Sequence, residues 1–266
     1  MYLLNQFWSP RKLYEPCGMF TNGHIQLLLL SMFILSILLF KSKKITDNQI
    51  IKVTKGFAVF ITVLEGIKIY FNFHYGYTWI NAWFPMSYCS LFIYALWLSG
   101  YGKGKYKKMG EGFIAGVAIV AGGTYLLIPS TALTMYPMWH YLCMYSMLFH
   151  TLMVYMGILY IWKKEINLNM SIYKMYSTFF LLFATIAITL NSAFESNLMF
   201  LREPSSIPVP LLHTLYNNSK WGYTLLVFSV YLFIPYCATA YVSRAIRREK
   251  LNKQLEYDEE VVSVLN

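Results

Sequence analysis

Residues 83–98 read Trp-Phe-Pro-Met-Ser-Tyr-Cys-Ser-Leu-Phe-Ile-Tyr-Ala-Leu-Trp-Leu, an apolar run without a charged side chain. Pro85 stands near its start, and Cys89 follows about one helical turn later. Several other apolar runs approach or exceed the roughly 17–25 residues that a helix needs to cross a bilayer. So many runs could not all be buried in the soluble core of a 266-residue chain. The sequence therefore predicts an all-α polytopic membrane protein.

The composition supports this class, because 57% of the residues are hydrophobic and only 13% are charged, against about a quarter in globular proteins. We predict one domain over residues 1–248, followed by a cytoplasmic tail at 249–266. The domain is expected to contain seven transmembrane helices, at about residues 23–40, 49–71, 82–99, 112–128, 139–162, 173–193 and 221–242.

The positive charge lies mainly in alternate connections of this scheme. Residues 41–55, 100–111 and 163–174 are rich in lysine, and arginines follow the last run. Cytoplasmic loops carry such an excess, so the N-terminus is expected outside and the C-terminus in the cytoplasm. This topological pattern accounts for the net charge of +10. We therefore expect a multi-pass protein of the cell membrane that does not bind nucleic acid.

Cofactor and metal motifs are not evident. The four cysteines have no CxxC spacing, so neither a zinc site nor a disulfide framework is indicated. His140, Cys143, Met147 and His150 share one helical face, which would suit copper. Methionine is also common packing material, and a packed face is the favoured interpretation. No cofactor and no bound metal are predicted.

Reactive groups gather at similar depths in neighbouring predicted spans. At 1.5 Å per residue, Cys89 and Glu65 lie about 10 Å and His150 about 15 Å below the outer boundary. Ionisable residues inside spans are often functional, although Glu65 could simply pair with Lys68 at i, i+3. Cys89 alone would be apolar filler, and a nearby histidine would make it a candidate nucleophile.

Several short motifs carry a resemblance along nearly the whole chain. They are His24 opening the first span, Pro85-x-x-x-Cys89-Ser90, Gly116 in a span that ends at Pro129, Tyr136-Pro137 followed by His150, and Asn197-Leu-Met-Phe-Leu-Arg202-Glu-Pro204. In this order they resemble the bacterial YwaF-type integral membrane protein family. That family is related to the eukaryotic transmembrane protein 164 type acyltransferases. Two positions, Ser87 and Thr151, depart from its motifs.

The resemblance implies a membrane-embedded lipid acyltransferase or transacylase with Cys89 as nucleophile and His150 as base. Its substrates would be membrane phospholipids or lysophospholipids. Two sets of supporting residues complete the candidate site. Glu65 and Asn191 are candidates for orienting the base or stabilising an oxyanion. His24, Asn197 and Arg202 belong to the motifs, and Ser87 occupies a motif position at which the family has another residue. A non-enzymatic membrane protein that binds or transports a lipid or small ligand is the alternative.

Overall fold

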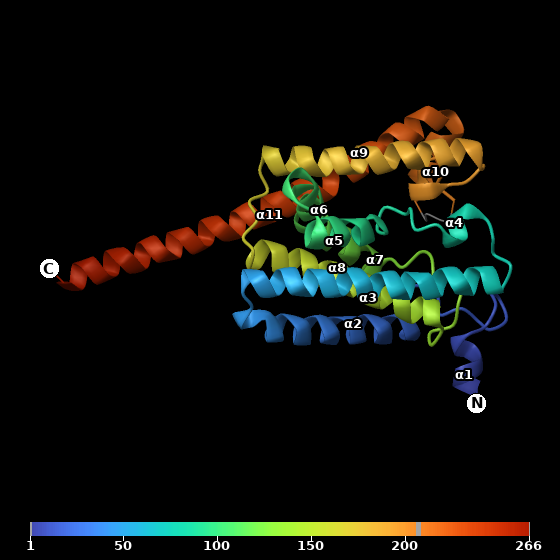
Figure 1. Cartoon of the computed structure of the whole chain (residues 1–266), viewed down its shortest axis with the longest axis horizontal. Coiled ribbons are helices and arrows are strands. Elements are labelled where there is room, and N and C mark those ends of the chain that lie inside the picture. Colours follow the sequence, from blue (N-terminus) through green and yellow to red (C-terminus); the bar gives the residue numbers. More distant parts are fainter. Residues whose placement is uncertain (1, 206–208, 266) are drawn as a thin grey trace.

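The structure, a computed structural model, describes the backbone of residues 2–205 and 209–265 and the side chains of residues 4–205 and 209–249. Every regular element in these ranges is a helix (Figure 1). The helices are α1 (Tyr2–Phe7), α2 (Asn22–Lys41), η1 (Ser42–Lys44), α3 (Asp47–His74), α4 (Ile80–Trp83), α5 (Leu91–Tyr101), α6 (Gly104–Gly116), α7 (Ala118–Leu127), α8 (Tyr141–Trp162), α9 (Met170–Ala193), η2 (Leu198–Phe200), α10 (Pro210–Asn218) and α11 (Lys220–Leu265). The all-α prediction is confirmed.

The expected number of seven spans is wrong. By length and composition, four helical segments among the described residues can cross a membrane, namely Asn22–Lys44, α8, α9 and Lys220–Glu249. The bent pair α6 and α7 raises the number to five if it counts as one span. These segments correspond to the first, fifth, sixth and seventh predicted spans, with the bent pair in place of the fourth.

The predicted spans at 49–71 and 82–99 account for the difference. Helix α3 is 28 residues long, but Lys52, Lys55, Glu65 and Lys68 interrupt its apolar sequence. In the span predicted at 82–99, Pro85 lies in a non-helical segment between α4 and α5. Helix α5 keeps only 11 residues, about 16 Å at 1.5 Å per residue, which is too short for the roughly 30 Å hydrocarbon core.

Helix α8 forms the centre of the bundle. Of its best membrane-spanning window, 78% is buried, against 22% for the segment Asn22–Lys44. Tyrosine hydroxyls on α8 join it to its neighbours: Tyr155 Oη lies 2.6 Å from Ser42 Oγ, and Tyr160 Oη lies 2.8 Å from Thr54 Oγ1 and 2.7 Å from Ser99 Oγ. Polar bridges of this kind connect helices where no water can satisfy a hydroxyl.

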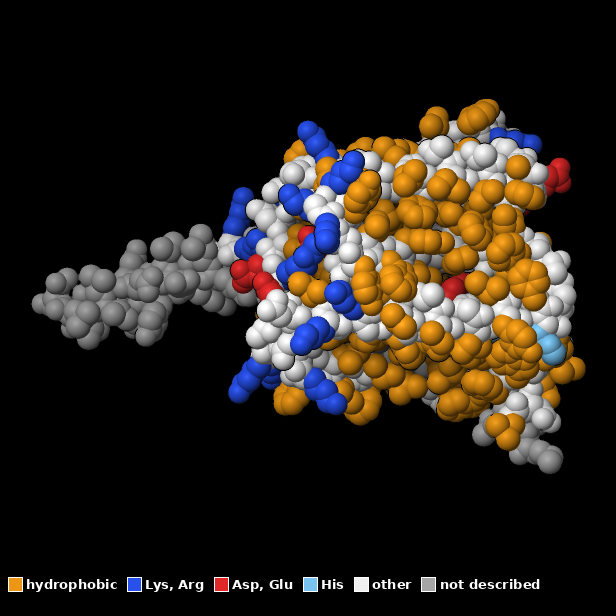
Figure 2. Space-filling model, in the orientation of Figure 1, with side chains coloured by type: hydrophobic (Ala, Val, Ile, Leu, Met, Phe, Trp, Pro, Cys, Tyr) orange, Lys and Arg blue, Asp and Glu red, His pale blue; other side chains and the backbone are white. Residues whose placement is uncertain are grey.

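The surface separates apolar from charged residues along the long axis. A broad apolar band covers the middle of the visible face, and Lys and Arg gather at the end from which α11 extends (Figures 1 and 2). We call this the basic end, defined by Lys43 and Lys163, where Lys163 Nζ donates to the Lys43 carbonyl, and by Arg247, which donates to the Ile166 carbonyl. A lipid-facing band with a basic border agrees with a membrane protein, while the predicted orientation of the two termini stays a prediction.

Candidate functional site

His150 lies in the buried middle of α8 and has one engaged ring nitrogen. Its Nδ1 is 2.7 Å from the Ser146 carbonyl oxygen, one turn earlier. A carbonyl only accepts hydrogen bonds, so Nδ1 carries the proton and Nε2 presents a lone pair. Within the described residues, the buried Nε2 has no hydrogen-bond partner. Buried polar atoms are nearly always paired, so this nitrogen calls for an explanation.

Helix α7 fixes the imidazole ring of His150 from one side. Tyr125 stacks on it with a ring-centroid distance of 3.6 Å and an interplanar angle of 8°. The Tyr125 hydroxyl accepts a 2.6 Å hydrogen bond from Ser146 Oγ and lies 3.0 Å from Thr131 Oγ1. Gly122 allows the close approach of the helices, because a Cβ there would lie 2.9 Å from the His150 carbonyl oxygen. The imidazole is therefore held in one orientation.

Cys89 lies in the non-helical segment that leads into α5. Its side chain is half-buried, and its carbonyl oxygen accepts the Phe92 amide at 3.0 Å, in the first turn leading into the helix. Ser87 and Ser90 form the adjacent turn, in which the Ser90 amide donates to Ser87 Oγ at 3.1 Å and the two hydroxyls lie 2.7 Å apart. The Ser87 hydroxyl thus helps to shape the backbone around Cys89.

A backbone carbonyl of α11 that lacks its helical partner anchors the segment around Cys89. Pro235 has no amide hydrogen, so the Tyr231 carbonyl lacks its usual helical partner. The Tyr88 and Tyr176 hydroxyls donate to this carbonyl instead, at 2.9 and 2.5 Å. The Tyr88 ring also stacks on Tyr231 with centroids 4.1 Å apart. The residue next to Cys89 is therefore attached to α9 and α11.

Aromatic side chains connect the surroundings of Cys89 and His150. Phe92 packs edge-to-face against Phe149, the neighbour of His150, with centroids 5.8 Å apart. In the described part of the chain, no hydrogen bond joins Cys89 to His150. The structure thus brings the flanking residues together, and direct pairing of the thiol with the imidazole stays a prediction.

Glu65 forms a separate cluster on α3 and α8. Its carboxylate accepts a 2.5 Å hydrogen bond from the Tyr145 hydroxyl and pairs with Lys68 at 2.5 Å. The Glu65–Lys68 pair at i, i+3 is thus present, as the neutralising interpretation expects. Tyr145 packs on Phe149 with centroids 5.9 Å apart. Glu65 therefore reaches the surroundings of His150 through two aromatic rings.

His24 connects two helix ends. Its Nε2 lies 2.9 Å from the Leu126 carbonyl near the end of α7, and its Nδ1 accepts the Phe20 amide at 3.1 Å. With both ring nitrogens engaged, His24 stabilises the packing of α2 on α7. This packing role is sufficient to explain the histidine at this motif position.

Asn191 lies in the last turn of α9, and Asn197 and Arg202 lie in the loop that follows. Asn191 Oδ1 accepts the Leu198 amide at 2.6 Å, and its Nδ2 donates to the Leu198 carbonyl at 3.0 Å. Asn197 Oδ1 accepts the Arg202 amide at 3.0 Å. The Arg202 side chain is exposed. The side-chain amides of Asn191 and Asn197 therefore hold the backbone of this loop in place. Residues 206–208 of the loop lie outside the described residues.

The copper alternative receives no support. His140 Nδ1 accepts the Leu142 amide and its Nε2 lies 3.1 Å from the Ser9 carbonyl. The Cys143 thiol donates to the carbonyl oxygens of Ala132 and Tyr136. Nowhere in the described ranges do three His, Cys, Asp or Glu side chains form a group that could hold a metal ion.

Sequence reasoning missed three residues that shape this region: Tyr125, Ser146 and Pro235. Ser146 stands four residues before His150, a spacing that would have indicated the carbonyl contact. Pro235 inside an apolar run could have indicated an unpaired carbonyl at Tyr231. The partner of His150 on α7 had no such signal, since ring stacking depends on how two helices pack.

The apolar helices and the surface pattern define a multi-pass α-helical membrane protein. Residues 19–241 match the TMEM164 family, and the chain belongs to that family. Comparisons with curated proteins and with solved structures found no match. The matched range includes Cys89, His150 and every supporting residue predicted from the sequence. The likeness to bacterial YwaF-type proteins stays a prediction.

Proposed function

We propose that this TMEM164 family member is a lipid acyltransferase or transacylase of the cell membrane, with Cys89 as nucleophile and His150 as general base. One observation carries the proposal. Among the described residues the buried His150 Nε2 has no hydrogen-bond partner, while Nδ1 is fixed by Ser146 and the ring by Tyr125. A histidine held in this way has its basic nitrogen available for proton transfer.

The reaction proceeds through an acyl-cysteine. Nε2 of His150 accepts the Cys89 thiol proton while the sulfur attacks the ester carbonyl of a phospholipid. The tetrahedral intermediate expels the glycerol oxygen, which takes the proton from His150 and leaves as a lysophospholipid. A second lysophospholipid then gives its hydroxyl proton to His150 and attacks the thioester, which restores the thiol.

The proposal places a geometric requirement on the segment Phe84–Ser90. The thiol has to come within hydrogen-bond reach of Nε2 in the substrate complex, although apo enzymes commonly show longer separations. This segment is non-helical, and Phe92 packs on Phe149 beside His150. The proposed reaction therefore requires the segment, which lies outside the helical ladders, to bring the thiol to Nε2 when substrate binds.

The surroundings of the pair support a lipid substrate. Cys89 and His150 lie among apolar and aromatic side chains of a membrane protein, where the acyl chains of a lipid are the natural neighbours. A transfer between two lipids needs no cofactor. Phospholipids and lysophospholipids are thus the proposed partners.

The test is acyl exchange between a phospholipid and an isotope-labelled lysophospholipid, catalysed by the purified protein in lipid nanodiscs. We expect the wild type to produce labelled phospholipid. Cys89→Ala and His150→Gln should lower the rate by at least about 100-fold, since a general base alone contributes 10²–10⁴. Cys237→Ala, at an exposed cysteine of α11, is the matched control and should retain the wild-type rate.

A second candidate function is non-enzymatic lipid or small-ligand binding or transport. It is favoured by the lack of a hydrogen bond between Cys89 and His150 within the described residues, and by an apolar pocket between α7, α8 and α11. Wild-type protein that exchanges no acyl group but binds lipid saturably in the same nanodiscs would support this alternative.

A further inference from the structure

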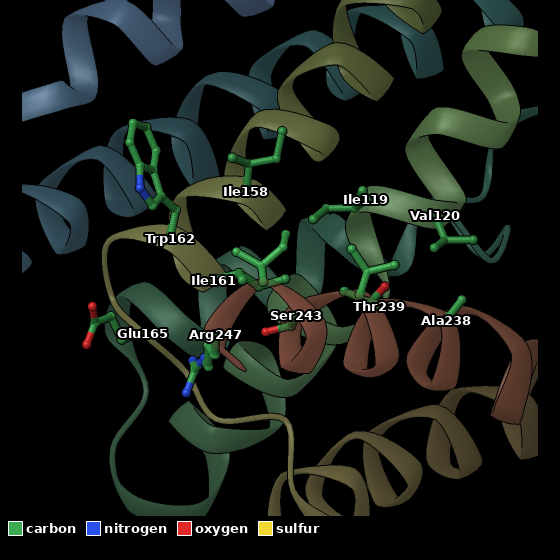
Figure 3. Close-up of a pocket in the computed structure, with 12 residues that line it drawn as sticks. Ile119, Val120, Ile158, Ile161, Trp162, Glu165, Ala238, Thr239, Ser243 and Arg247 are labelled. Atoms are coloured by element: carbon green, nitrogen blue, oxygen red, sulfur yellow. The ribbon is translucent and has the colours of Figure 1, made fainter. Parts of the chain in front are cut away.

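A pocket of about 460 Å³ lies between α7, α8 and α11, near the basic end (Figure 3). This volume falls within the roughly 300–1,000 Å³ of small-molecule sites. Its wall is mostly apolar and includes Ile119, Ile158, Ile161, Val242 and Ile246. The isoleucines come from α7, α8 and α11, so three helices enclose one apolar groove.

The groove is separate from the proposed catalytic pair. Ile158 follows His150 by eight residues on α8, which corresponds to about 12 Å along the helix axis. Between them the two helices pack closely, since a Cβ on Gly157 would lie 2.6 Å from Ile119 Cγ1. A ligand in the groove therefore lies about two helical turns along α8 from His150.

The groove opens sideways toward the membrane. Val242 and Ile246 on α11 are 54% and 50% exposed, although both line the pocket. Both belong to the segment Lys220–Glu249, which can cross a membrane. In a bilayer, hydrocarbon rather than water faces such a surface. An acyl chain is thus the ligand that can enter from the side.

Charged groups mark one end of the groove. Glu165 and Arg247 lie together at that end, whereas Val120 and Ala238 lie at the other (Figure 3). Arg247 Nη2 donates to the Ile166 carbonyl at 2.9 Å, which leaves further guanidinium N–H groups for an anion. Glu165 is exposed and offers a carboxylate to a cation. An acid and a base beside an apolar groove match a zwitterionic headgroup.

We propose that this groove binds a glycerophospholipid with an amine-bearing zwitterionic headgroup. One acyl chain lies between α7, α8 and α11, Arg247 pairs with the phosphate, and Glu165 pairs with the ammonium group. The proposal is independent of acyl transfer, because no group of the lipid contacts Cys89 or His150. The bound lipid holds the protein at a fixed depth in the leaflet that lies at the basic end.

Native mass spectrometry of the full-length, delipidated protein tests this proposal. The probes are phosphatidylethanolamine and phosphatidylglycerol with identical acyl chains, of which only the first carries an ammonium group. We expect saturable binding of phosphatidylethanolamine by the wild type. Arg247→Gln should weaken it about tenfold, the effect of one charge-assisted hydrogen bond. Glu165→Gln should remove the preference over phosphatidylglycerol, and Ala238→Trp, which fills the groove, should abolish binding of both.

Arg244→Gln is the matched control, since Arg244 Nη2 donates to the Leu168 carbonyl of the same loop but does not line the pocket. It should bind as the wild type does. Equal losses in Arg244→Gln and Arg247→Gln, or unchanged binding in Ala238→Trp, would overturn the proposal. Cys89→Ala should bind normally, so a failure of acyl transfer does not affect this test. Arg247→Lys, which keeps the charge, checks that Arg247→Gln acts through the phosphate rather than through folding.

Discussion

At the scale of single residues, the buried histidines differ in what their ring nitrogens do. His24 uses both nitrogens to connect α2 with α7, and His140 uses both to bind the α8 start and Ser9. His150 uses Nδ1 alone, and within the described chain its Nε2 stays unpaired. The first two arrangements stabilise the fold, whereas the third leaves the Nε2 lone pair available, as the proposed base requires.

This difference leads to opposite effects of substitution. His24→Ala should lower the free energy of unfolding by about 1–3 kcal/mol, because the buried Leu126 carbonyl loses its partner, and should leave acyl exchange largely intact. His150→Asn keeps a donor near the Ser146 carbonyl but has no basic nitrogen. It should reduce exchange at least about 100-fold. Unfolding in denaturant and the exchange assay measure both, and comparable activity losses in the two variants would contradict the distinction.

The candidate site was partly predictable at this scale. The sequence motifs singled out Cys89 and His150, and helical spacing placed Glu65 beside Lys68, where the structure shows an ion pair. The contacts of Asn191 and Asn197 were not predictable, because a side-chain amide can serve a loop or a substrate equally well. Only the folded loop shows that they bind the backbone of residues 198–203.

At the scale of elements, the missing backbone hydrogen bond at Pro235 of α11 explains how the Cys89 segment is held. Tyr88→Phe and Tyr176→Phe each leave the Tyr231 carbonyl with one donor, and each should cost about 1 kcal/mol. The double variant leaves that carbonyl without a donor and should cost more than the sum. Adding Pro235→Ala restores an amide for Tyr231 and should recover most of the loss. Chemical unfolding of the wild type and the four variants measures the cycle, and strict additivity without rescue would refute it.

Adjacent glycines of α7 provide a matched pair. A Cβ at Gly122 would lie 2.9 Å from the His150 carbonyl oxygen, whereas Gly123 faces open space. Gly122→Ala should force α7 away from α8, disturb the Tyr125 stack and cost about 1–3 kcal/mol. Gly123→Ala should be neutral or stabilising by up to about 1 kcal/mol, from helix propensity. Thermal unfolding and acyl exchange distinguish them, and equal behaviour of the two variants would exclude the close α7–α8 contact.

At the scale of the whole molecule, the sequence predicted the class of fold better than its details. Long apolar runs without interruption became α2, α8, α9 and α11 near the expected positions. The run at 82–99 did not, because Pro85 removes a backbone donor and the serine turn shortens the helix that follows. The mean hydropathy of such a run depends on its composition alone, so it does not show where a proline removes a backbone hydrogen bond.

The distribution of charge predicts the orientation. Lys and Arg gather at the basic end (Figure 2), so the positive-inside rule puts this end in the cytoplasm. Fluorescent-protein fusions to the C-terminus should fluoresce in the cytoplasm, and alkaline phosphatase fused to the N-terminus should be active outside. An inactive N-terminal phosphatase fusion would show that the termini do not lie on opposite sides.

The central claim is that Cys89 carries the acyl group and that His150 enables its transfer. The most direct measurement incubates the protein with a phospholipid that bears an alkyne-tagged acyl chain, followed by peptide mass spectrometry. The account predicts a hydroxylamine-sensitive thioester on Cys89, absent in Cys89→Ala and strongly reduced in His150→Gln. Acylation of another cysteine, or equal labelling of Cys89 in wild type and His150→Gln, would contradict it.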